Sequence, residues 1–66
     1  MTYNEALKRE RLRVGVSQRE VAEILNVAQP LIAKWEKGEG SAPNISRLIQ
    51  LADVYGTSID QLVGRT

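Results

Sequence analysis

Residues 18–37, QREVAEILNVAQPLIAKWEK, decide the fold, because two helix signals follow one another here with almost no linker between them. Ser17 opens the first helix in a capping box of the form S-x-x-E, and Asn26 ends it. Pro30 lies in the first turn of the second helix, where a missing N–H costs nothing. A link of three or four residues cannot bring two helices antiparallel, so we expect them to cross steeply.

Small and apolar residues should hold this crossing in place. Ala22 is small enough for the helix after the turn to approach the helix before it. Val27 fills the turn from inside, while Ile32 and Trp35 point toward the core. This is the geometry of a helix-turn-helix. The alternative is an ordinary small helical bundle with a sharp corner.

Further helix signals precede and follow this stretch. A capping box opens at Thr2, and Gly15 ends the helix that follows it. Asn44 caps a later helix that ends at Gly56, and a last capping box opens at Ser58. We therefore expect an all-α, compact bundle of five short helices without a sheet. The residues of these three outer helices that should point inward are Tyr3, Leu7, Val14, Leu48, Leu51, Ala52, Tyr55, Ile59 and Leu62.

Composition limits the chemistry that the chain can perform. It has 66 residues, with no cysteine and no histidine. This excludes a disulfide framework, a Cys/His zinc site and histidine-based acid–base catalysis. The chain also lacks a phosphate loop of the form G-x-x-x-x-G-K. We therefore expect no enzyme activity, no catalytic residue, no metal and no cofactor.

The same composition bears on domain organisation and location. A chain of this length forms one domain, so residues 1–66 should fold together. No stretch approaches the roughly 18 apolar residues of a membrane span, and MTYNEALKRE contains no apolar signal segment. We expect a cytoplasmic protein without a membrane partner. The formal net charge of +1 does not by itself indicate a nucleic-acid partner, so the positions of the charges must decide.

The helix-turn-helix signal lies within a longer pattern of residues. Within residues 18–37 and directly after them, the pattern consists of Gln18, Ala22, Asn26, Val27, Ile32, Glu36 and Gly38. Outside that window it continues at Arg11, Gly15, Ser17, Pro43, Leu51, Ala52, Tyr55, Gly56, Thr57 and Ser58. With this register the chain resembles the Cro/repressor class, the XRE family of bacterial and phage regulators, over about residues 5–63. Ala28 departs from the family, which has a Ser or Thr cap worth about 1 kcal/mol there.

Arg11 supports the fold independently of the turn. It lies on the same helix stripe as Leu7 and Val14, so it should face inward and need a carboxylate partner. Glu36 follows Ile32 by four residues, near the end of its helix. The resemblance implies a structural ion pair between Arg11 and Glu36. The alternative is that both are solvated charges.

The outward face of the helix after the turn is the expected reader of DNA bases. Glutamine can pair bidentately with adenine, lysine can reach guanine acceptors, and proline or alanine can contact a thymine methyl group. The resemblance places Gln29, Pro30 and Lys34 at base-reading positions, and Ala33 shares their face. The alternative for Gln29 and Lys34 is a solvated face without a ligand.

Phosphate contacts are expected from helix N-termini and nearby donors. The resemblance implies that Gln18 contacts a phosphate, and Arg19 follows it directly. By contrast, we expect Lys8, Arg9 and Arg13 of the first helix to form a solvated face. The complete set of expected phosphate contacts is Gln18, Arg19, Lys37, Ser41, Asn44 and Arg47.

These expectations together indicate a sequence-specific regulator of transcription, of bacterial or phage origin, that binds double-stranded DNA. A repressor that binds a palindromic operator as a homodimer fits the resemblance best. The resemblance implies dimer contacts at Thr57, Ile59 and Val63, although Val63 could instead simply cap the core. The alternative function is a protein-interaction module on the same fold, such as a coactivator or antitoxin domain. An apolar or acidic outward face on the helix after the turn would favour that alternative.

Overall fold

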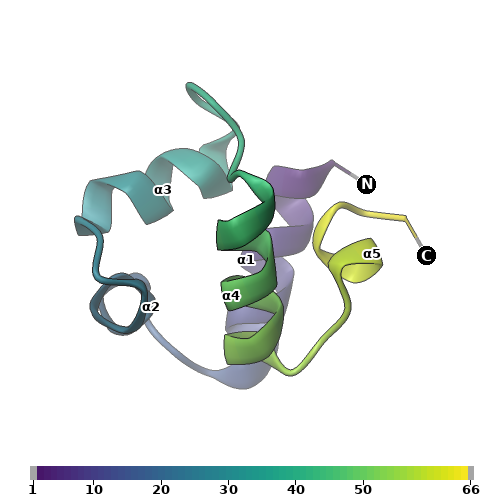
Figure 1. The fold of residues 1–66 in the computed structure, drawn as a ribbon, viewed down its shortest axis with the longest axis horizontal. Coiled ribbons are helices and arrows are strands. Elements are labelled where there is room, and N and C mark those ends of the chain that lie inside the picture. The colour runs from purple at the N-terminus through teal and green to yellow at the C-terminus, as the bar shows by residue number, and fades with distance from the viewer. Residues whose placement is uncertain (1, 66) are drawn as a thin grey trace.

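Five α-helices follow one another in the structure, a computed structural model that describes residues 2–65. They are α1 (Tyr3–Val14), α2 (Gln18–Leu25), α3 (Gln29–Lys37), α4 (Ile45–Tyr55) and α5 (Ile59–Leu62). Figure 1 shows α1 and α4 in the centre, with α2 and α3 on one side and the short α5 on the other. Within residues 2–65 there is no strand, so the predicted all-α, five-helix architecture is confirmed.

Two of the three predicted capping boxes are complete. The backbone N–H groups of Glu5 and Glu20 donate to the Thr2 and Ser17 hydroxyls, and each glutamate side chain bonds back to its N-cap. The third is only half formed. Ser58 accepts from the backbone N–H of Gln61 at 3.2 Å, but the Gln61 side-chain oxygen accepts from Arg9 Nη2 at 3.1 Å. Gln61 therefore connects α5 to α1.

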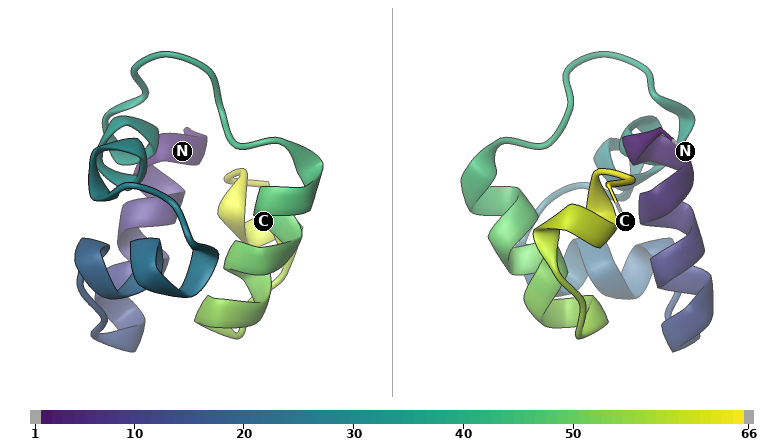
Figure 2. Two further views of the ribbon diagram at one scale, coloured as in Figure 1. Left: turned by 60° about the vertical axis from the view of Figure 1, so that its left-hand side comes forward. Right: turned by 90° about the vertical axis from the view of Figure 1, so that its right-hand side faces the viewer.

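The turn between α2 and α3 has the predicted conformation. Asn26 adopts φ 57°, the one positive φ outside glycine among the described residues, and the N–H of Val27 donates to Ala22 O at 2.9 Å. The turn leaves α3 crossing α2 steeply, so that α2 is seen end-on in Figure 1 while α3 runs across the view. The longer loop between α3 and α4 arches above the helices in Figure 2.

The end of α3 fits closely against the start of α1. Gly38 closes α3 at φ 75°, and a Cβ atom on it would lie 3.2 Å from Cγ of Asn4. Both the backbone conformation and the neighbour therefore favour glycine at this position.

The start of α4 is capped as predicted, because Asn44 accepts from the N–H of Arg47 at 2.9 Å.

A single aliphatic and aromatic core joins the helices. Its buried residues are Leu7, Val21, Ala22, Leu25, Ile32, Trp35, Leu51, Ala52, Tyr55 and Leu62. Tyr3, Val27, Leu48 and Ile59 are partly buried against it, as their inward positions predicted. The prediction for Val14 is wrong, because its side chain is 41% exposed at the last residue of α1. Val16, beyond the glycine turn, packs against the core instead.

A buried carboxylate on α1 was not predicted. Glu10 is 5% exposed and accepts from Arg13 Nε at 2.9 Å and from Arg9 Nε at 3.1 Å. Arg13 Nη2 also donates to Tyr55 O at 2.6 Å, and Arg9 Nη2 donates to Gln61 O at 3.2 Å. The expected solvated face is thus wrong for Arg9, which is partly buried, whereas Lys8 and Arg13 are exposed as expected, Arg13 in spite of its two hydrogen bonds. The two arginines attach α1 to the end of α4 and to α5.

The environment of Glu10 determines how its carboxyl titrates. Burial by itself would raise the pKa, but the hydrogen bonds from Arg13 and Arg9 outweigh it and hold the pKa below its usual value. A group whose pKa is lower in the folded state contributes stability above its unfolded pKa and loses it as the pH falls through the folded value. Glu10 therefore stabilises the domain at neutral pH and ceases to do so in acid.

We predict that Glu10→Gln lowers the free energy of unfolding at pH 7 by about 1.5–3 kcal/mol, because charge-assisted hydrogen bonds are lost. We further predict that the variant loses less stability than the wild type when the pH falls from 7 to about 3. That range extends below the ordinary glutamate pKa of about 4.3, because the pKa of Glu10 is lowered. Urea unfolding across this pH range measures both effects. The exposed Glu23, changed to Gln, is the control. Parallel pH profiles for wild type and Glu10→Gln would contradict the prediction.

Candidate nucleic-acid interface

The outward face of α3 is exposed in the structure. Gln29, Pro30 and Lys34 are exposed and Ala33 is partly exposed, whereas Ile32 and Trp35 on the opposite side are 1% and 4% exposed. The structure therefore presents all four predicted base-reading residues on one accessible surface. Lys37, in the last turn of the same helix, is also exposed.

The first turn of α3 carries no side-chain cap. Ala28 is the N-cap residue and makes no side-chain hydrogen bond, and Pro30 lies in the first turn. Pro30 has no N–H and the N–H of Leu31 donates to Ala28 O at 3.0 Å, so the N–H of Gln29 is the one backbone donor left uncapped in the first three residues of α3. The helix dipole adds a partial positive charge at the same place.

The position of α3 depends on a buried ion pair with α1. Arg11 Nε donates to Glu36 Oε2 at 2.7 Å and Arg11 Nη2 donates to Glu36 Oε1 at 3.1 Å, so the contact is bidentate. The two side chains are only 11% and 4% exposed. The hydrogen bonds from Arg11 to Glu36 raise the pKa of the arginine above its usual value. Arg11 Nη1 also donates to Val16 O at 3.0 Å, which holds the turn before α2.

Gln18 extends this pair to the start of α2. Its Nε2 donates to Glu36 Oε1 at 3.1 Å, and the residue is half-buried rather than exposed. An amide nitrogen carries two hydrogens, so one of them is left for another acceptor. Gln18 therefore lies at the first residue of α2 in an orientation that Glu36 determines.

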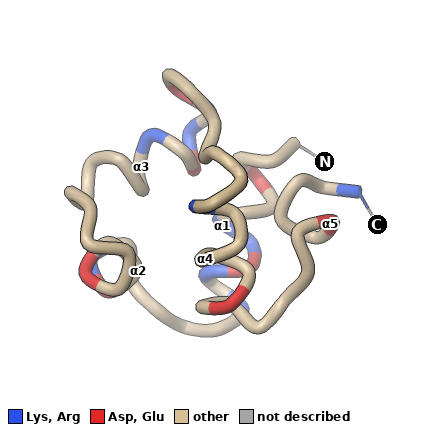
Figure 3. The backbone as a smooth tube through the Cα atoms, in the orientation of Figure 1, with Lys and Arg blue, Asp and Glu red and all other residues tan. Residues whose placement is uncertain are grey.

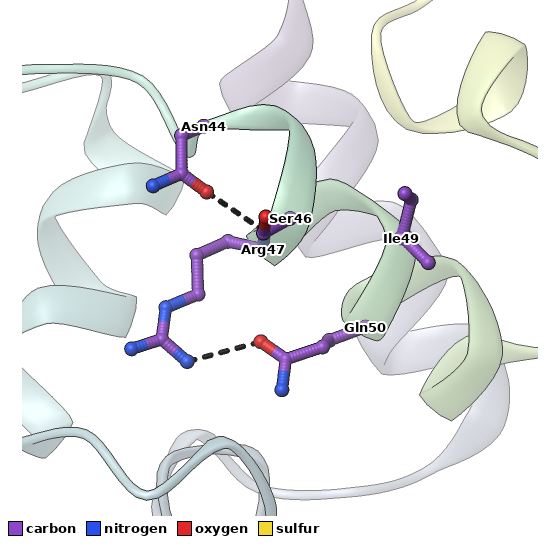
Figure 4. Close-up of a pocket in the computed structure, with 5 residues that line it drawn as sticks. All are labelled: Asn44, Ser46, Arg47, Ile49 and Gln50. Carbon is purple, nitrogen blue, oxygen red and sulfur yellow. Dashed lines mark hydrogen bonds between the residues drawn. The ribbon is translucent and has the colours of Figure 1, made fainter.

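The other predicted phosphate ligands lie in two places. Arg19 is exposed on α2, where its Nε donates to Glu23 Oε1 at 3.2 Å. Ser41 and Asn44 are exposed in the loop before α4. Arg47 is only half-exposed, because its Nη1 donates to Leu25 O at 3.1 Å and to Gln50 Oε1 at 3.0 Å. Figure 4 shows the Arg47 side chain extended beside Gln50.

A surface groove brings together one predicted base-reading residue and three of the predicted phosphate ligands. It lies between α3 and the start of α4, and its polar lining includes Lys34, Ser41, Asn44 and Arg47. Glu39 also lines it, so the groove is not uniformly basic. Figure 3 shows the same contrast, with basic positions on α3 and an acidic one in the loop that follows. Gln18, Arg19, Gln29 and Pro30 lie outside this groove, at the starts of α2 and α3.

The residues predicted for a dimer contact lie around α5. Thr57, Ile59 and Val63 are all partly buried, and Ile59 also packs against the core. Two exposed apolar residues on the neighbouring α4 were not predicted: Ile45 and Ile49 are 62% and 50% exposed. The sequence could have indicated this exposure, because Ile45 and Ile49 are four residues apart and share a helix face that does not contain the buried Leu51. In Figure 4, Ile49 points to the opposite side of α4 from Arg47.

Over residues 2–65, no group of three Asp, Glu, His or Cys side chains is placed to hold a metal ion. Within the same residues, no helix has the length and apolar character needed to cross a membrane.

The steep α2–α3 crossing, the exposed polar face of α3 and the buried Arg11–Glu36 pair define a helix-turn-helix domain. A helix-turn-helix family model matches residues 7–62, and the chain belongs to this family, in its Cro/repressor or XRE branch. It is 35% identical over 63 residues to the transcriptional activator BcrR of Enterococcus faecalis, which matches 96% of this chain and 30% of BcrR.

A solved structure has the same fold. The P22 c2 repressor, crystallised with a synthetic operator, superposes with a TM-score of 0.89 over 100% of this chain and 98% of its own, at 23% identity. The (S)-2-hydroxypropylphosphonic acid epoxidase of Streptomyces wedmorensis is 35% identical over 60 residues, or 91% of this chain and 30% of the epoxidase. The chain thus spans less than a third of BcrR and of the epoxidase.

We predict that Arg11→Ala and Glu36→Ala each lower the free energy of unfolding by about 3–5 kcal/mol, because each leaves an uncompensated buried charge. For a domain this small, that loss approaches the whole stability. Thermal melts of both variants measure it. Arg19→Ala, which removes an exposed ion pair, should change stability by less than about 1 kcal/mol. Unchanged midpoints for Arg11→Ala and Glu36→Ala would show that the pair does not support the fold.

Proposed function

We propose that this domain is a sequence-specific regulator of transcription that binds double-stranded DNA, and that it acts as a repressor on a palindromic operator. The observation that carries the proposal is the exposed face of α3, where Gln29 and Lys34 lie on a helix fixed from behind by Ile32, Trp35 and the Arg11–Glu36 pair. A rigid helix with exposed amide and ammonium groups suits the major groove, whose base edges offer matching acceptors and donors.

Gln29 and Lys34 are the proposed base readers, with Pro30 and Ala33 beside them. Gln29 lies at the first residue of α3 and enters the groove first, and Lys34 follows from a later turn. Glutamine selects adenine through two hydrogen bonds, and lysine reaches the O6 and N7 acceptors of guanine. The apolar Pro30 and Ala33 fit the methyl group of thymine.

The proposed phosphate contacts surround this helix. Gln18 and Arg19 lie at the start of α2, Lys37 lies at the end of α3, and the remaining contacts come from the start of α4 and its loop. Helix N-termini favour anions through their free N–H groups and dipole, so the starts of α2 and α4 suit phosphates. The members of the α4 group are Ser41, Asn44 and Arg47.

A homodimer completes the proposal. One half-site offers few contacts, and two-fold related domains on half-sites about 34 Å apart would double them. The proposed dimer contact consists of Thr57, Ile59 and Val63. The exposed Ile45 and Ile49 add apolar surface on α4, the helix that packs against α5. A dimer that covers an operator would repress by blocking other proteins there. The proposed place of action is the bacterial cytoplasm, for a protein that the bacterium or a phage encodes.

The alternative, a protein-interaction module, is favoured by one observation. Ile45 and Ile49 lie one turn apart on α4 and are 62% and 50% exposed, and Ile24 is 59% exposed. Contiguous exposed apolar patches mark protein contacts. These isoleucines lie on α2 and α4 rather than on α3. We therefore place DNA recognition first, since the α3 face is polar and carries Lys34 and Lys37.

The base-reading role makes a specific prediction. On an operator selected by the wild type, Gln29→Ala should relax base preference at one symmetric pair of positions, and Lys34→Ala at a different pair. Each loss should amount to about 1–3 kcal/mol of discrimination. Competition binding with single-base operator variants measures it. Both substitutions should leave the melting temperature nearly unchanged, because both side chains are exposed. If both variants kept the affinity and preferences of the wild type, α3 would not be the reading helix.

The phosphate role predicts a salt effect. If roughly three to five phosphates are neutralised per subunit, log affinity should fall with log salt by about 0.9 per phosphate. Arg19→Ala should weaken binding to all duplexes about equally and flatten this slope by about one. Titrations from low to moderate salt measure the affinity and its slope. Glu23→Gln is the matched control, because it removes the ion-pair partner of Arg19 but keeps the arginine. An affinity independent of salt would instead support a protein partner.

A further inference from the structure

Arg47 connects two parts of the proposed DNA-binding surface that the sequence separates. It is the third residue of α4, and its Nη1 donates to Leu25 O at 3.1 Å, across 22 positions of the chain. The same nitrogen donates to Gln50 Oε1 at 3.0 Å, which holds the guanidinium from the side of α4 (Figure 4). Leu25 is the last residue of α2, directly before the turn.

The Leu25 carbonyl needs a partner from outside its helix. The last four carbonyls of a helix have no intrahelical donor. At the end of α2, the N–H groups of Asn26 and Val27 donate to Ala22 O and Glu23 O. The Leu25 carbonyl instead accepts from Arg47.

Charge favours the same contact. The C-terminus of a helix carries a partial negative charge and is stabilised by a nearby cation. The last turn of α2 contains no basic residue, so Arg47 provides this cation from α4. The turn is also weakly anchored at its far end, because the N-cap Ala28 makes no side-chain hydrogen bond. The contact from Arg47 is therefore a polar anchor for the turn from another helix.

Arg47 also lines the groove between α3 and α4, together with Lys34, Ser41 and Asn44. Its Nη1 is occupied by Leu25 and Gln50, while the other guanidinium nitrogens make no hydrogen bond within residues 2–65. One end of the guanidinium thus holds the helix-turn-helix, and the remainder lies at the surface proposed to meet phosphate.

We propose that Arg47 is a positioning residue, which holds the α2–α3 turn against α4 so that the base-reading helix and the phosphate-binding loop keep a fixed relative position. The proposal rests on the DNA-binding function proposed above. It goes further in one respect, because it makes operator selectivity depend on a residue of α4 that reads no base.

The first test uses the free protein and needs no DNA. The N–H of Val27, bonded to Ala22 O, reports opening of the turn through hydrogen exchange measured by NMR. In Arg47→Ala, exchange at Val27 should accelerate roughly tenfold or more beyond any change at core amides such as that of Leu51, as expected for one lost charge-assisted hydrogen bond. Gln50→Ala is the matched control, since it removes the other partner of Nη1. Arg47→Lys, which can still donate to Leu25 O, should restore most of the protection.

The second test compares a selected operator with an unrelated duplex of equal length. Arg47→Ala should reduce the ratio of the two affinities by roughly tenfold, while Arg47→Lys retains most of it. A pure phosphate contact would weaken both duplexes equally and leave Val27 exchange unchanged, which would overturn the proposal. A purely structural role would lower stability without changing the affinity ratio, and would overturn it too. If the wild type bound no duplex while Val27 exchange changed as expected, the anchoring would stand and the DNA-binding function would fail.

Discussion

The buried ion pair between Arg11 and Glu36 is the constraint on which the rest of the structure depends. Removing two charges from water is costly, so the contact is tolerated only because both partners are present in bidentate geometry. Through it, α1 holds the end of α3, and through Gln18 the same carboxylate holds the start of α2. One carboxylate therefore fixes two helices that carry the proposed DNA contacts. The polar face of α3 is useful for recognition only because its opposite face is fixed in this way.

Further polar contacts extend this arrangement to the other helices. Glu10 and its two arginines attach α1 to the end of α4 and to α5, and Arg47 attaches α4 to the end of α2. The core residues are mostly aliphatic, and aliphatic packing alone permits several similar arrangements of short helices. Hydrogen bonds to particular backbone carbonyls are directional, so they favour one arrangement. In a chain of 66 residues, these few contacts are a large part of what specifies the structure.

The sequence predicted the features that depend on neighbouring residues. Thr2, Ser17 and Asn26 act on backbone groups within a few positions, so helix ends and the turn could be recognised from local pattern. The contacts of Arg13 with Tyr55 O and of Arg47 with Leu25 O could not, because every residue has a carbonyl and no side chain marks the acceptor. Val14 fits the helical period but lies where no other helix covers it. The surface of α3 was predicted correctly, while its base contacts remain predictions.

We propose that the exposed face of α3 reads DNA sequence as part of a two-fold dimer. Selection of bound duplexes from a random pool, with the purified domain, tests this proposal most directly. We predict recovery of a palindrome whose half-sites are centred about one helical turn, or 34 Å, apart. Within each half-site we expect an enriched A·T pair for Gln29 and an enriched G·C pair for Lys34. A pool that shows no enriched sequence after repeated rounds at low salt would contradict the proposal.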